Sequence, residues 1–467
     1  GKRYCGPSLQ ALTQLATYAT EQLPNPEGKG RSITVLRKEF TEEWCHSVTP
    51  EVFVHRDWPN RIFTGQEFNN RVRPFSDVDD TARLIKMDAA SKSAIIKYSP
   101  PMRPGIYVDT GGQRFINTHV PSCIKATKGS VKLWETFLEN LIPGEGDRKE
   151  LMRWCATLIA RPDIKMLYGV LLISEQQGVG KSTLGEKILR PLMGEENVSC
   201  PSESEVVDSA FNYWAAHKRL AVVHEIYAGH SSKAYDRLKN IITDSSIMVS
   251  KKYQANYEIE NWIHIFACSN SMRAIKLSMD DRRWFVPQVT DLKQPYEYWR
   301  KLNEWLQEGE GLGAIRWWAT EWLKKNAPVL AGDDAPWSSA KREIIEEGYS
   351  PGQQLVSQFL TRAREEFGDK PVIILDTDLV KMIRDHIYEG RQNDRLERPL
   401  TVRKIAKSMG WYIGKERAQI REWGTASSFA KIISNSKELA GAKAGAIAEK
   451  VRPLDVAKRA AEWLSAM

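Results

Sequence analysis

Several features that would assign a chain to a special class are missing from these 467 residues. No apolar run approaches about 18 residues, so neither a transmembrane helix nor a membrane partner is expected. The first ten residues, GKRYCGPSLQ, lack the apolar core of a secretory signal. They also lack an initiator methionine, so we expect the chain to be a fragment of a longer protein. Internal repeats and long low-complexity segments are absent as well, which excludes solenoid and fibrous architectures.

Cysteine is scarce and scattered. The six cysteines form no C-x-x-C pair and accompany no histidine cluster, so nothing supports a zinc site. Cys155 and Cys268 lie within apolar segments and are expected to be small core residues. This cysteine usage fits a reducing, cytoplasmic compartment.

What is present is the composition of a globular protein. Hydrophobic residues make up 42% of the chain and charged residues 27%, and the length suffices for two to four domains. The net charge is +8. This charge favours a polyanionic partner, although many basic proteins bind no nucleic acid.

The order of the patterns predicts five segments. Residues 1–31 are weakly patterned and end in a linker-like run, whereas residues 32–125 read as a small mixed α/β region. Two amphipathic helices make residues 126–164 a helical, collar-like segment. Residues 165–330 alternate strand and helix, as in a parallel α/β sheet, and residues 340–467 are mostly helical.

The stretch LLISEQQGVGKSTLGEKIL, residues 171–189, combines a strand, a glycine turn and a helix. The pattern G-x-x-x-x-G-K-[ST] has glycine where this chain has Glu175. We expect the Glu175 carboxylate to point away from bound phosphates, because like charges repel. Lys181 would reach the β- and γ-phosphates of ATP, and the Ser182 hydroxyl would bind Mg²⁺. The alternative is a surface turn that is merely rich in Gly, Lys and Ser. The loop predicted to hold the nucleotide consists of Gly178, Val179, Gly180, Lys181, Ser182 and Thr183.

Polar residues follow two further apolar strands. LAVV is followed by His224 and Glu225, and IHIFACS by Asn270. Glu225 suits a carboxylate that binds Mg²⁺ and orients or deprotonates the attacking water, and Asn270 suits a sensor of the γ-phosphate. Arg282 and Arg283 lie farther on, where an arginine could reach a neighbouring subunit's phosphate. The alternatives are an ordinary strand end, a turn-starting asparagine, and salt bridges to the adjacent aspartates.

Between these strands, SIMVS and YEIENW are predicted to form two arms of a hairpin. Its tip would carry Lys251, Lys252 and Tyr253, with Gln254 and Asn256 beside them. Two cations next to an aromatic ring suit single-stranded DNA, because charge binds phosphate and the ring stacks on a base. A solvated hairpin tip is the alternative.

Taken together, GVGKST, AVVHEIYAGHS, LKNIITDSSIMVSKKY, IHIFACSNS and DDRRWFVP resemble the ordered motifs of superfamily 3 helicases. The chain resembles most the helicase module of phage- and plasmid-type primase–helicases and primase–polymerases. The resemblance spans residues 165–290. It departs from the family at Glu175 and at His224, which stands in place of the usual first acid.

This resemblance implies an AAA+-like phosphate-loop ATPase with a parallel sheet, working as a hexameric homo-oligomeric ring with ATP and Mg²⁺. It implies translocation on single-stranded DNA and the unwinding of replication-fork DNA. Lys181 and Ser182 would bind nucleotide, Glu225 would be the catalytic acid, and Asn270 the sensor. Arg282 or Arg283 would be the arginine supplied in trans, and Lys251 and Lys252 would contact DNA. Such a protein would work in the cytoplasm of a bacterial host, encoded by a phage or mobile element.

Many relatives carry a primase domain before this module. Residues 1–125 are too short for one, so a primase or polymerase domain is expected outside this chain. The D-x-D of SDVDD, residues 76–80, lacks a preceding apolar strand and reads as a polar loop. Since His224 replaces an acid, a nucleotide-gated DNA-binding or loading platform with little ATP turnover is the competing hypothesis.

The C-terminal segment is predicted to be winged-helix-like. From Arg398 to Arg421 the chain has seven Lys or Arg and one acid, Glu416. TVRKIAKSMGW reads as a helix capped by Thr401. The same pattern also serves in protein-binding folds, so duplex contact is one of two alternatives. Residues expected to touch DNA here are Lys404, Lys407, Lys415, Arg417 and Arg421.

Overall fold

The computed structural model describes residues 20–23, 33–87, 94–226, 233–250, 252, 256–272, 274–275, 277–307, 310–387, 398–418, 430–442 and 451–464. The chain divides into two compact units. The first comprises residues 1–276 and 281–341, and the second comprises residues 277–280 and 342–467.

The first unit begins with a small α/β region. A short antiparallel pair, β1 (Thr20–Leu23) and β2 (Ile33–Leu36), places one strand inside the stretch predicted to be a linker. Two three-stranded sheets follow, in the orders β3-β4-β5 and β6-β8-β7. Aromatic side chains, among them Trp44, Phe53 and Phe68, fill the core of this region. The elements are β3 (Trp44–Val48), β4 (Glu51–His55), β5 (Trp58–Phe63), β6 (Ile95–Lys97), β7 (Gly105–Val108), β8 (Arg114–Asn117), α2 (Lys38–Glu43), α3 (Gly65–Val72) and α4 (Thr81–Met87).

The centre of the first unit is a parallel sheet of five strands in the order β10-β11-β14-β9-β15. Three of its strands are apolar and completely buried, as strands covered on both faces must be. The mixed α/β fold with a parallel sheet that the sequence predicts is therefore confirmed. The strands are β9 (Gly169–Ile173), β10 (Val198–Ser199), β11 (Leu220–Val223), β14 (His264–Ser269) and β15 (Trp284–Phe285).

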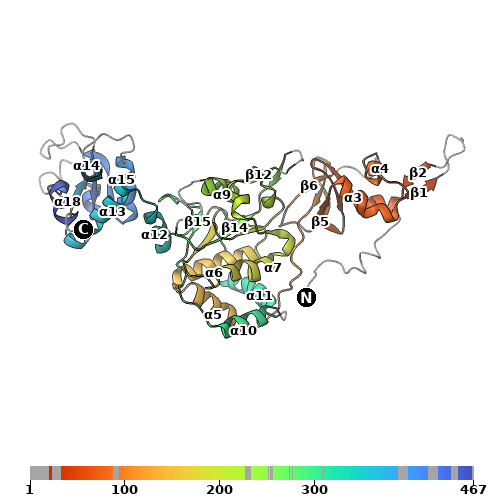
Figure 1. Ribbon diagram of the computed structural model, residues 1–467, viewed down its shortest axis with the longest axis horizontal. Helices are drawn as coiled ribbons and strands as arrows, with labels where there is room; N and C mark the ends of the chain where they lie inside the picture. Colours follow the sequence, from red (N-terminus) through yellow and green to blue (C-terminus); the bar gives the residue numbers. More distant parts are fainter. Residues whose placement is uncertain are drawn as a thin grey trace. The chain divides into compact units, whose positions relative to one another are not determined.

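Helices cover both faces of this sheet, and Figure 1 shows α6, α7 and α11 on one side and α9 on the other. The two predicted helices before the sheet are α5 (Lys132–Leu141) and α6 (Glu145–Ala160), and α6 ends before Pro162 as expected. Their apolar stripes, including Trp134 and Trp154, join the main core. The remaining helices here are η2 (Thr183–Leu189), α7 (Arg190–Met193), η3 (Glu195–Asn197), α8 (Glu203–Val207), η4 (Tyr213–Ala215), α9 (Lys233–Thr243), α10 (Tyr296–Gln307) and α11 (Glu310–Lys325).

A β-hairpin stands apart from the sheet. Its arms, β12 (Ser246–Val249) and β13 (Tyr257–Glu260), pair antiparallel, with Val249 opposite Tyr257. The hairpin predicted from SIMVS and YEIENW is therefore confirmed. Most of its tip lies outside the described residues.

The second unit is helical with one small sheet. Three antiparallel strands lie in the order β16-β18-β17. Val356, Phe359, Ile383 and Val402 are completely buried in its core. The elements are α13 (Pro351–Phe367), β16 (Ile373–Leu375), α14 (Asp376–Ile387), α15 (Pro399–Ser408), β17 (Tyr412–Ala418), β18 (Ala430–Ser434), α16 (Lys437–Gly441) and α18 (Val456–Leu464), and α12 (Ser339–Glu347) spans the division between the units.

One local expectation was wrong. Thr401 does not cap α15, because this helix begins at Pro399, whose fixed φ suits a first turn. Cys123 is disulfide-bonded, whereas Cys45, Cys155, Cys200 and Cys268 are free. The cysteines therefore give no argument for a reducing compartment.

Within the described ranges, no helix is long and apolar enough to cross a membrane.

Candidate functional site

The register of the sheet brings the predicted polar strand ends to one edge. Ile173 pairs with Ser269 across β9 and β14, and Val223 pairs with Ala267 across β11 and β14. Because the strands are parallel, the segments after β9, β11 and β14 all leave the sheet on the same side. Ligands bind at this edge in open α/β sheets.

The loop after β9 depends on its glycines. Gly178 has a φ of 80° and Gly180 a φ of 115°, conformations that residues with a side chain rarely adopt. A Cβ atom on Gly180 would also lie 2.9 Å from Trp299 and 3.0 Å from Phe137. The helix that follows begins with a π-helical segment at Thr183. Its N-terminal amides and the turned loop form a concave surface suited to an anion.

Lys181 is a buried cation held by carbonyl oxygens. Its side chain is 6% exposed, and its Nζ donates to the carbonyls of Ser174 at 2.7 Å and Gln176 at 3.1 Å. Burial lowers the pKa of the Lys181 amine, while the charges of Cys268 and Asp291 raise it. No ion pair to Lys181 occurs among the described residues. A buried amine in this state fits an anionic ligand, which would supply the charge that the protein lacks here.

The loop encloses a cavity of about 490 Å³ together with both predicted polar strand ends. Glu225 and Asn270 line it together with Lys181. Glu175 is exposed and does not line the cavity, as expected for a carboxylate that avoids phosphate. All six residues predicted for the loop contribute to the lining, namely Gly178, Val179, Gly180, Lys181, Ser182 and Thr183.

Glu225 has an unusual backbone. Its φ is 53°, a left-handed conformation that is costly for a residue with a side chain. The sequence shows no sign of this strain. Strained residues persist where the surrounding structure imposes them, and they gather at functional sites. Here the strain follows a strand whose register is set on both sides, so the carboxylate is placed by the sheet.

His224, where the sequence departs from the motifs that it resembles, lies beside a carboxylate of the helix that follows the glycine loop. Its Nε2 lies 2.8 Å from Oε1 of Glu186, which stands on the helix after the loop. The pairing places an acid beside the end of β11, although that acid comes from a different segment. Neither His224 nor Glu186 lines the cavity.

The two arginines lie at the opposite end of the sheet from the loop. They precede β15, whose Trp284 pairs with Gly169 at the start of β9. The five residues of β9 separate that point from the loop, a span of about 17 Å. Arg282 is 62% exposed and 3.9 Å from Asp334, not paired with the adjacent aspartates as the alternative had it. Arg283 is half-buried.

Asp281, beside these arginines, is structural. It is buried and 3.1 Å from the ammonium group of Lys341, which is also completely buried. Its carboxylate also accepts from the hydroxyl of Tyr235 at 2.7 Å. Asp281 therefore anchors the arginine-bearing segment.

The residues predicted to contact DNA are only partly described. Lys251, Tyr253 and Gln254 lie outside the described residues, and so does Arg421. Lys252 and Asn256 are exposed at the end of the hairpin.

In the second unit, the basic residues differ in their surroundings. Lys404 on α15 forms an ion pair with Asp280, so its charge is already engaged. Lys407 and Lys415 are exposed, and Arg417 belongs to β17. The structure does not gather these residues around one cavity within the described ranges.

Sequence reasoning missed one wall of the cavity. Trp299 and Asn303 of α10 and Lys187 of the loop helix line it, and Lys187 Nζ donates to Asn303 Oδ1 at 3.0 Å. Trp299 lies in a Trp-rich stretch that reads only as an amphipathic helix. Its approach to Gly180 follows from how α10 folds back, which no local pattern encodes.

Comparisons with known proteins relate part of this chain to a described family and to a phage replication protein. A family of unknown function, DUF5906, matches residues 172–283, the segment that holds the loop, Glu225, Asn270 and both arginines. The DNA primase-polymerase of Nitratiruptor phage NrS-1 is 25% identical over 304 residues, covering 62% of this chain and 39% of that protein. The chain thus spans about two fifths of the length of this curated relative.

Solved structures of the NrS-1 C-terminal region share the fold. One apo structure has a TM-score of 0.55 at 17% identity, covering 78% of this chain and 85% of that one. Its A form has a TM-score of 0.57 at 17% identity, covering 84% and 95%. These similarities relate the chain to phage DNA-replication proteins of the primase-polymerase type.

Proposed function

We propose that this chain is the ATP-driven DNA helicase module of a phage- or plasmid-type replication protein, of superfamily 3. One observation carries the proposal. A buried lysine on a glycine loop, a strand-end carboxylate and a strand-end asparagine line one cavity of about 490 Å³. This set contains the groups that a phosphoryl-transfer site needs.

Each residue of the cavity has a separate role in nucleotide binding or hydrolysis. The amides of Gly178 to Thr183 bind the nucleotide phosphates, and Lys181 exchanges its carbonyl partners for phosphate oxygens. Ser182 and Glu225 would hold Mg²⁺, which when bound neutralises charge on the phosphates. Glu225 accepts the proton of the attacking water, and Asn270 donates to the γ-phosphate or holds that water. Trp299 excludes bulk water, because its ring closes the cavity wall beside Gly180.

Arg282 and Arg283 act on a neighbouring subunit in this proposal. Their place some 17 Å from the loop of the same chain, across β9, leaves them out of reach of its cavity. A ring of identical subunits, expected to be hexameric, would bring an arginine of one subunit to the phosphates of the next. Lys251, Lys252 and Tyr253 would carry single-stranded DNA through the ring.

Fold details support the same assignment. Read in chain order, the parallel sheet has its strands in the order 5-1-4-3-2 with the loop after the first strand, as in an AAA+-like core. The second unit has the order helix, strand, two helices, then two strands in an antiparallel sheet, as in a winged helix. Lys407, Lys415 and Arg417 would contact duplex DNA there. Priming would belong to a part of the protein outside this chain, working in the cytoplasm of a bacterial host.

A loading platform with little ATP turnover is the second candidate. The observation in its favour is that His224 replaces an acid and binds Glu186, which holds this second carboxylate outside the cavity. Glu225 is then the one carboxylate lining the cavity that can serve both the metal, beside Ser182, and the water.

The decisive measurement is ATP hydrolysis and fork unwinding with Mg²⁺, with and without single-stranded DNA. The helicase should turn over ATP and be stimulated by DNA, and Lys181→Ala should abolish both activities. Lys165→Ala offers a matched control, because Lys165 is a half-buried lysine outside the cavity. Nucleotide binding without turnover would favour the platform. No nucleotide binding would reject both.

The subunit-interface part is tested by mixing two inactive variants. Glu225→Gln subunits keep their arginines, and Arg282→Ala/Arg283→Ala subunits keep their loops. Mixed rings contain some interfaces with an intact loop and an intact arginine pair, so activity should partly return. If mixing restores nothing while both variants still assemble, the arginines do not act in trans.

A further inference from the structure

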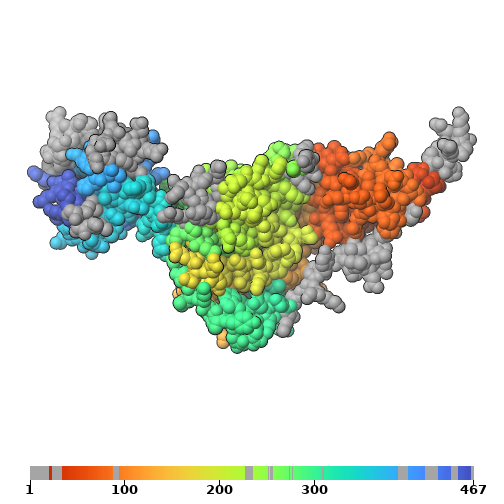
Figure 2. All heavy atoms as spheres, in the orientation of Figure 1, coloured from red at the N-terminus to blue at the C-terminus, as the bar shows by residue number. Residues whose placement is uncertain are grey.

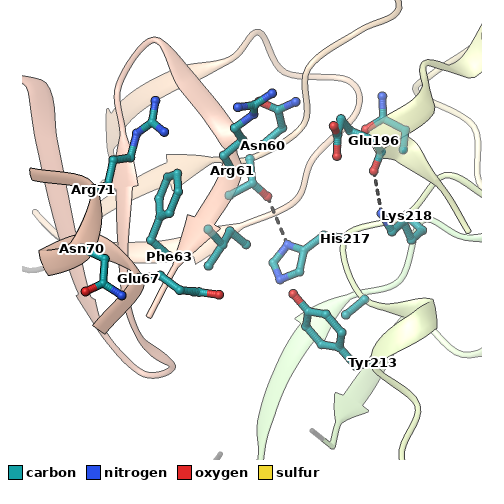
Figure 3. A pocket seen from close by; sticks show the side chains of 14 residues that line it. Asn60, Arg61, Phe63, Glu67, Asn70, Arg71, Glu196, Tyr213, His217 and Lys218 are labelled. Atoms are coloured by element: carbon teal, nitrogen blue, oxygen red, sulfur yellow. Dashed lines mark hydrogen bonds between the residues drawn. The ribbon is translucent and has the colours of Figure 1, made fainter. Parts of the chain in front are cut away.

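A second cavity of the first unit, of about 900 Å³, lies away from the proposed nucleotide site. Its volume is at the upper end of the range for small-molecule sites, about 300–1,000 Å³. Figure 3 shows Arg61, Phe63 and Arg71 on its N-terminal side and Tyr213 and Lys218 across from them. The small α/β region and the edge of the parallel sheet thus form its two walls, and Figure 2 shows these two parts packed against each other.

The two walls are held together by hydrogen bonds. Tyr98 of the small region donates to Asn197 Oδ1 at 2.9 Å, and Thr118 Oγ1 lies 3.1 Å from Nδ1 of His217. Both bonds are buried. The cavity is therefore built into the first unit.

The N-terminal wall presents two arginines, Arg61 and Arg71, beside the carboxylate of Glu67. Within the described part of the chain, neither Arg61 nor Arg71 forms an ion pair. The Arg71 guanidinium lies 5.5 Å from the Trp58 ring centroid and 5.8 Å from that of Phe63. Stacking on rings orients a guanidinium while leaving its edge free for a phosphate.

The remaining charges of the cavity are balanced or engaged. Lys218 donates to the carbonyl of Glu196 at 2.7 Å. Of the two carboxylates, Glu67 accepts from the backbone and hydroxyl of Thr64 at the start of α3. Glu196 is the other, and it lies beside Lys218 (Figure 3). The two arginines thus set the sign of the N-terminal wall.

An aromatic residue, Tyr213, lies across the cavity from the arginines (Figure 3). Tyr213 lines the cavity and is 37% exposed, enough to offer a ring face. Cations that bind a backbone, set opposite an aromatic ring that stacks on a base, are what single-stranded nucleic acid needs. Asn60 and Asn70 add amide groups that can hydrogen-bond to base edges.

The same wall is bonded to both arms of the β12–β13 hairpin. Asn212, next to Tyr213, donates from Nδ2 to the carbonyl of Met248 and accepts from the amide of Ser250, both at 2.8 Å. His217 Nε2 lies 3.3 Å from the hydroxyl of Tyr257 on the other arm. The tip of this hairpin begins directly after Ser250.

His217 links these parts at a strained position. Its φ is 56°, so both residues other than glycine with a positive φ in the described structure border a cavity, the other being Glu225. Burial lowers the pKa of His217 to about 4, so it is neutral at pH 7 and adds no charge to the wall. Its part is to hold the cavity against the hairpin.

We propose that this cavity binds a segment of single-stranded DNA, with Arg61 and Arg71 on its phosphates and Tyr213 stacked on a base. The DNA would continue from the hairpin into the cavity. This continuation is the one part of the proposal that rests on the proposed helicase function. Binding at the cavity requires no nucleotide.

The test is the affinity of the full chain for a fluorescent oligo(dT), measured by anisotropy over a range of salt concentrations without nucleotide. Arg61→Ala/Arg71→Ala should weaken binding about tenfold or more at low salt. It should also reduce the slope of log K against log salt by about 1.4, because each lost phosphate contact removes about 0.7. Arg73→Ala/Arg83→Ala removes the same charge from the same region outside the cavity, and should leave affinity and slope close to those of the parent.

A second pair of variants separates stacking from charge. Tyr213→Ala should weaken binding on the order of fivefold to a hundredfold without changing the salt slope, whereas Tyr213→Phe should bind normally. Tyr213→Phe also serves as the control for misfolding, because it preserves the ring and removes only the hydroxyl group.

Three results would overturn the proposal. The first is equal affinity of the cavity and control arginine variants. The second is a loss confined to Lys252→Ala, which would place DNA on the hairpin alone. The third is equally tight duplex binding that Arg61→Ala/Arg71→Ala weakens to the same extent, since the site would then not select single strands. Loss of ATP hydrolysis with intact DNA binding would instead reject only the helicase function.

Discussion

At the scale of single residues, the candidate site depends on where the backbone ends its strands. Glu225 has an exposed carboxylate, yet its position is fixed by a strand paired on both sides and by a left-handed φ of 53°. Its residue type was predictable, because an acid after an apolar strand is a common catalytic placement. The strain was not predictable, because it arises from the turn that the neighbouring strand imposes on residues 224–226.

Glu225→Gln should separate binding from hydrolysis. The amide keeps the size of the side chain but cannot accept a proton, so the hydrolysis rate should fall by roughly 10²–10⁴ while nucleotide affinity changes little. Single-turnover hydrolysis and equilibrium binding of a fluorescent nucleotide measure the two effects. Glu175→Gln, an exposed carboxylate of the same loop outside the cavity, should hydrolyse ATP at the parental rate. Normal hydrolysis by Glu225→Gln would remove Glu225 from the mechanism.

At the scale of elements, the predictable parts are those with a local pattern. The helical stripes of α5 and α6 follow from residue periodicity, and the buried strands and the hairpin follow from short apolar or strand-forming runs between turn residues. The start of α15 was misplaced because Thr401 looks like a cap, while Pro399 two residues earlier suits the first turn equally well. The wall formed by Trp299 could not be predicted, because it depends on the packing of α10 against a loop more than 100 residues away in the chain.

The loop after β9 offers a matched pair of glycine substitutions. Gly178 and Gly180 both have a positive φ, but a Cβ on Gly178 would meet nothing within 4 Å, whereas on Gly180 it would meet Trp299 and Phe137. Gly178→Ala should therefore cost only backbone strain, about 1–2 kcal/mol of the free energy of unfolding. Gly180→Ala adds overpacking, typically about 1–3 kcal/mol, and should distort the loop.

Chemical denaturation and nucleotide binding test this pair together. We expect Gly180→Ala to be the less stable variant and the one with the weaker nucleotide affinity. Equal losses for the two variants would show that α10 yields easily, and that Trp299 is not a rigid wall of the cavity.

At the scale of the whole molecule, buried histidines are confined to the first unit. Burial lowers the pKa of His55 and His217 to about 4 and that of His119 to about 3, and it holds the pKa of His264 well below its usual range. The second unit contains one histidine, His386, which is exposed. The two units should therefore respond differently to acid.

Acid should destabilise the first unit selectively. The buried histidines are neutral when folded but have a pKa of about 6.5 when unfolded, so their contribution is complete above about pH 6.5. It is lost as the pH falls from there toward 4, at about 2 kcal/mol for each such histidine at pH 5. Limited proteolysis at pH 7.5 and pH 5, read by mass spectrometry, should show cleavage sites appearing first within residues 33–341. Earlier cleavage of the second unit would contradict this assignment.

The division of the chain into units has a practical consequence for dissecting the protein. Residues 277–280 belong to the second unit although residues on both sides of them belong to the first. Met279 packs against the core of the second unit, and Asp280 pairs with Lys404. The backbone therefore passes between the units three times. A fragment that starts at residue 342 would lack residues 277–280 of the second unit. A single protease cut near residue 341 would not separate the two units, because the chain also connects them on both sides of residues 277–280. The arginines proposed to act on a neighbouring subunit lie just after that inserted segment, with Asp281 between them and it.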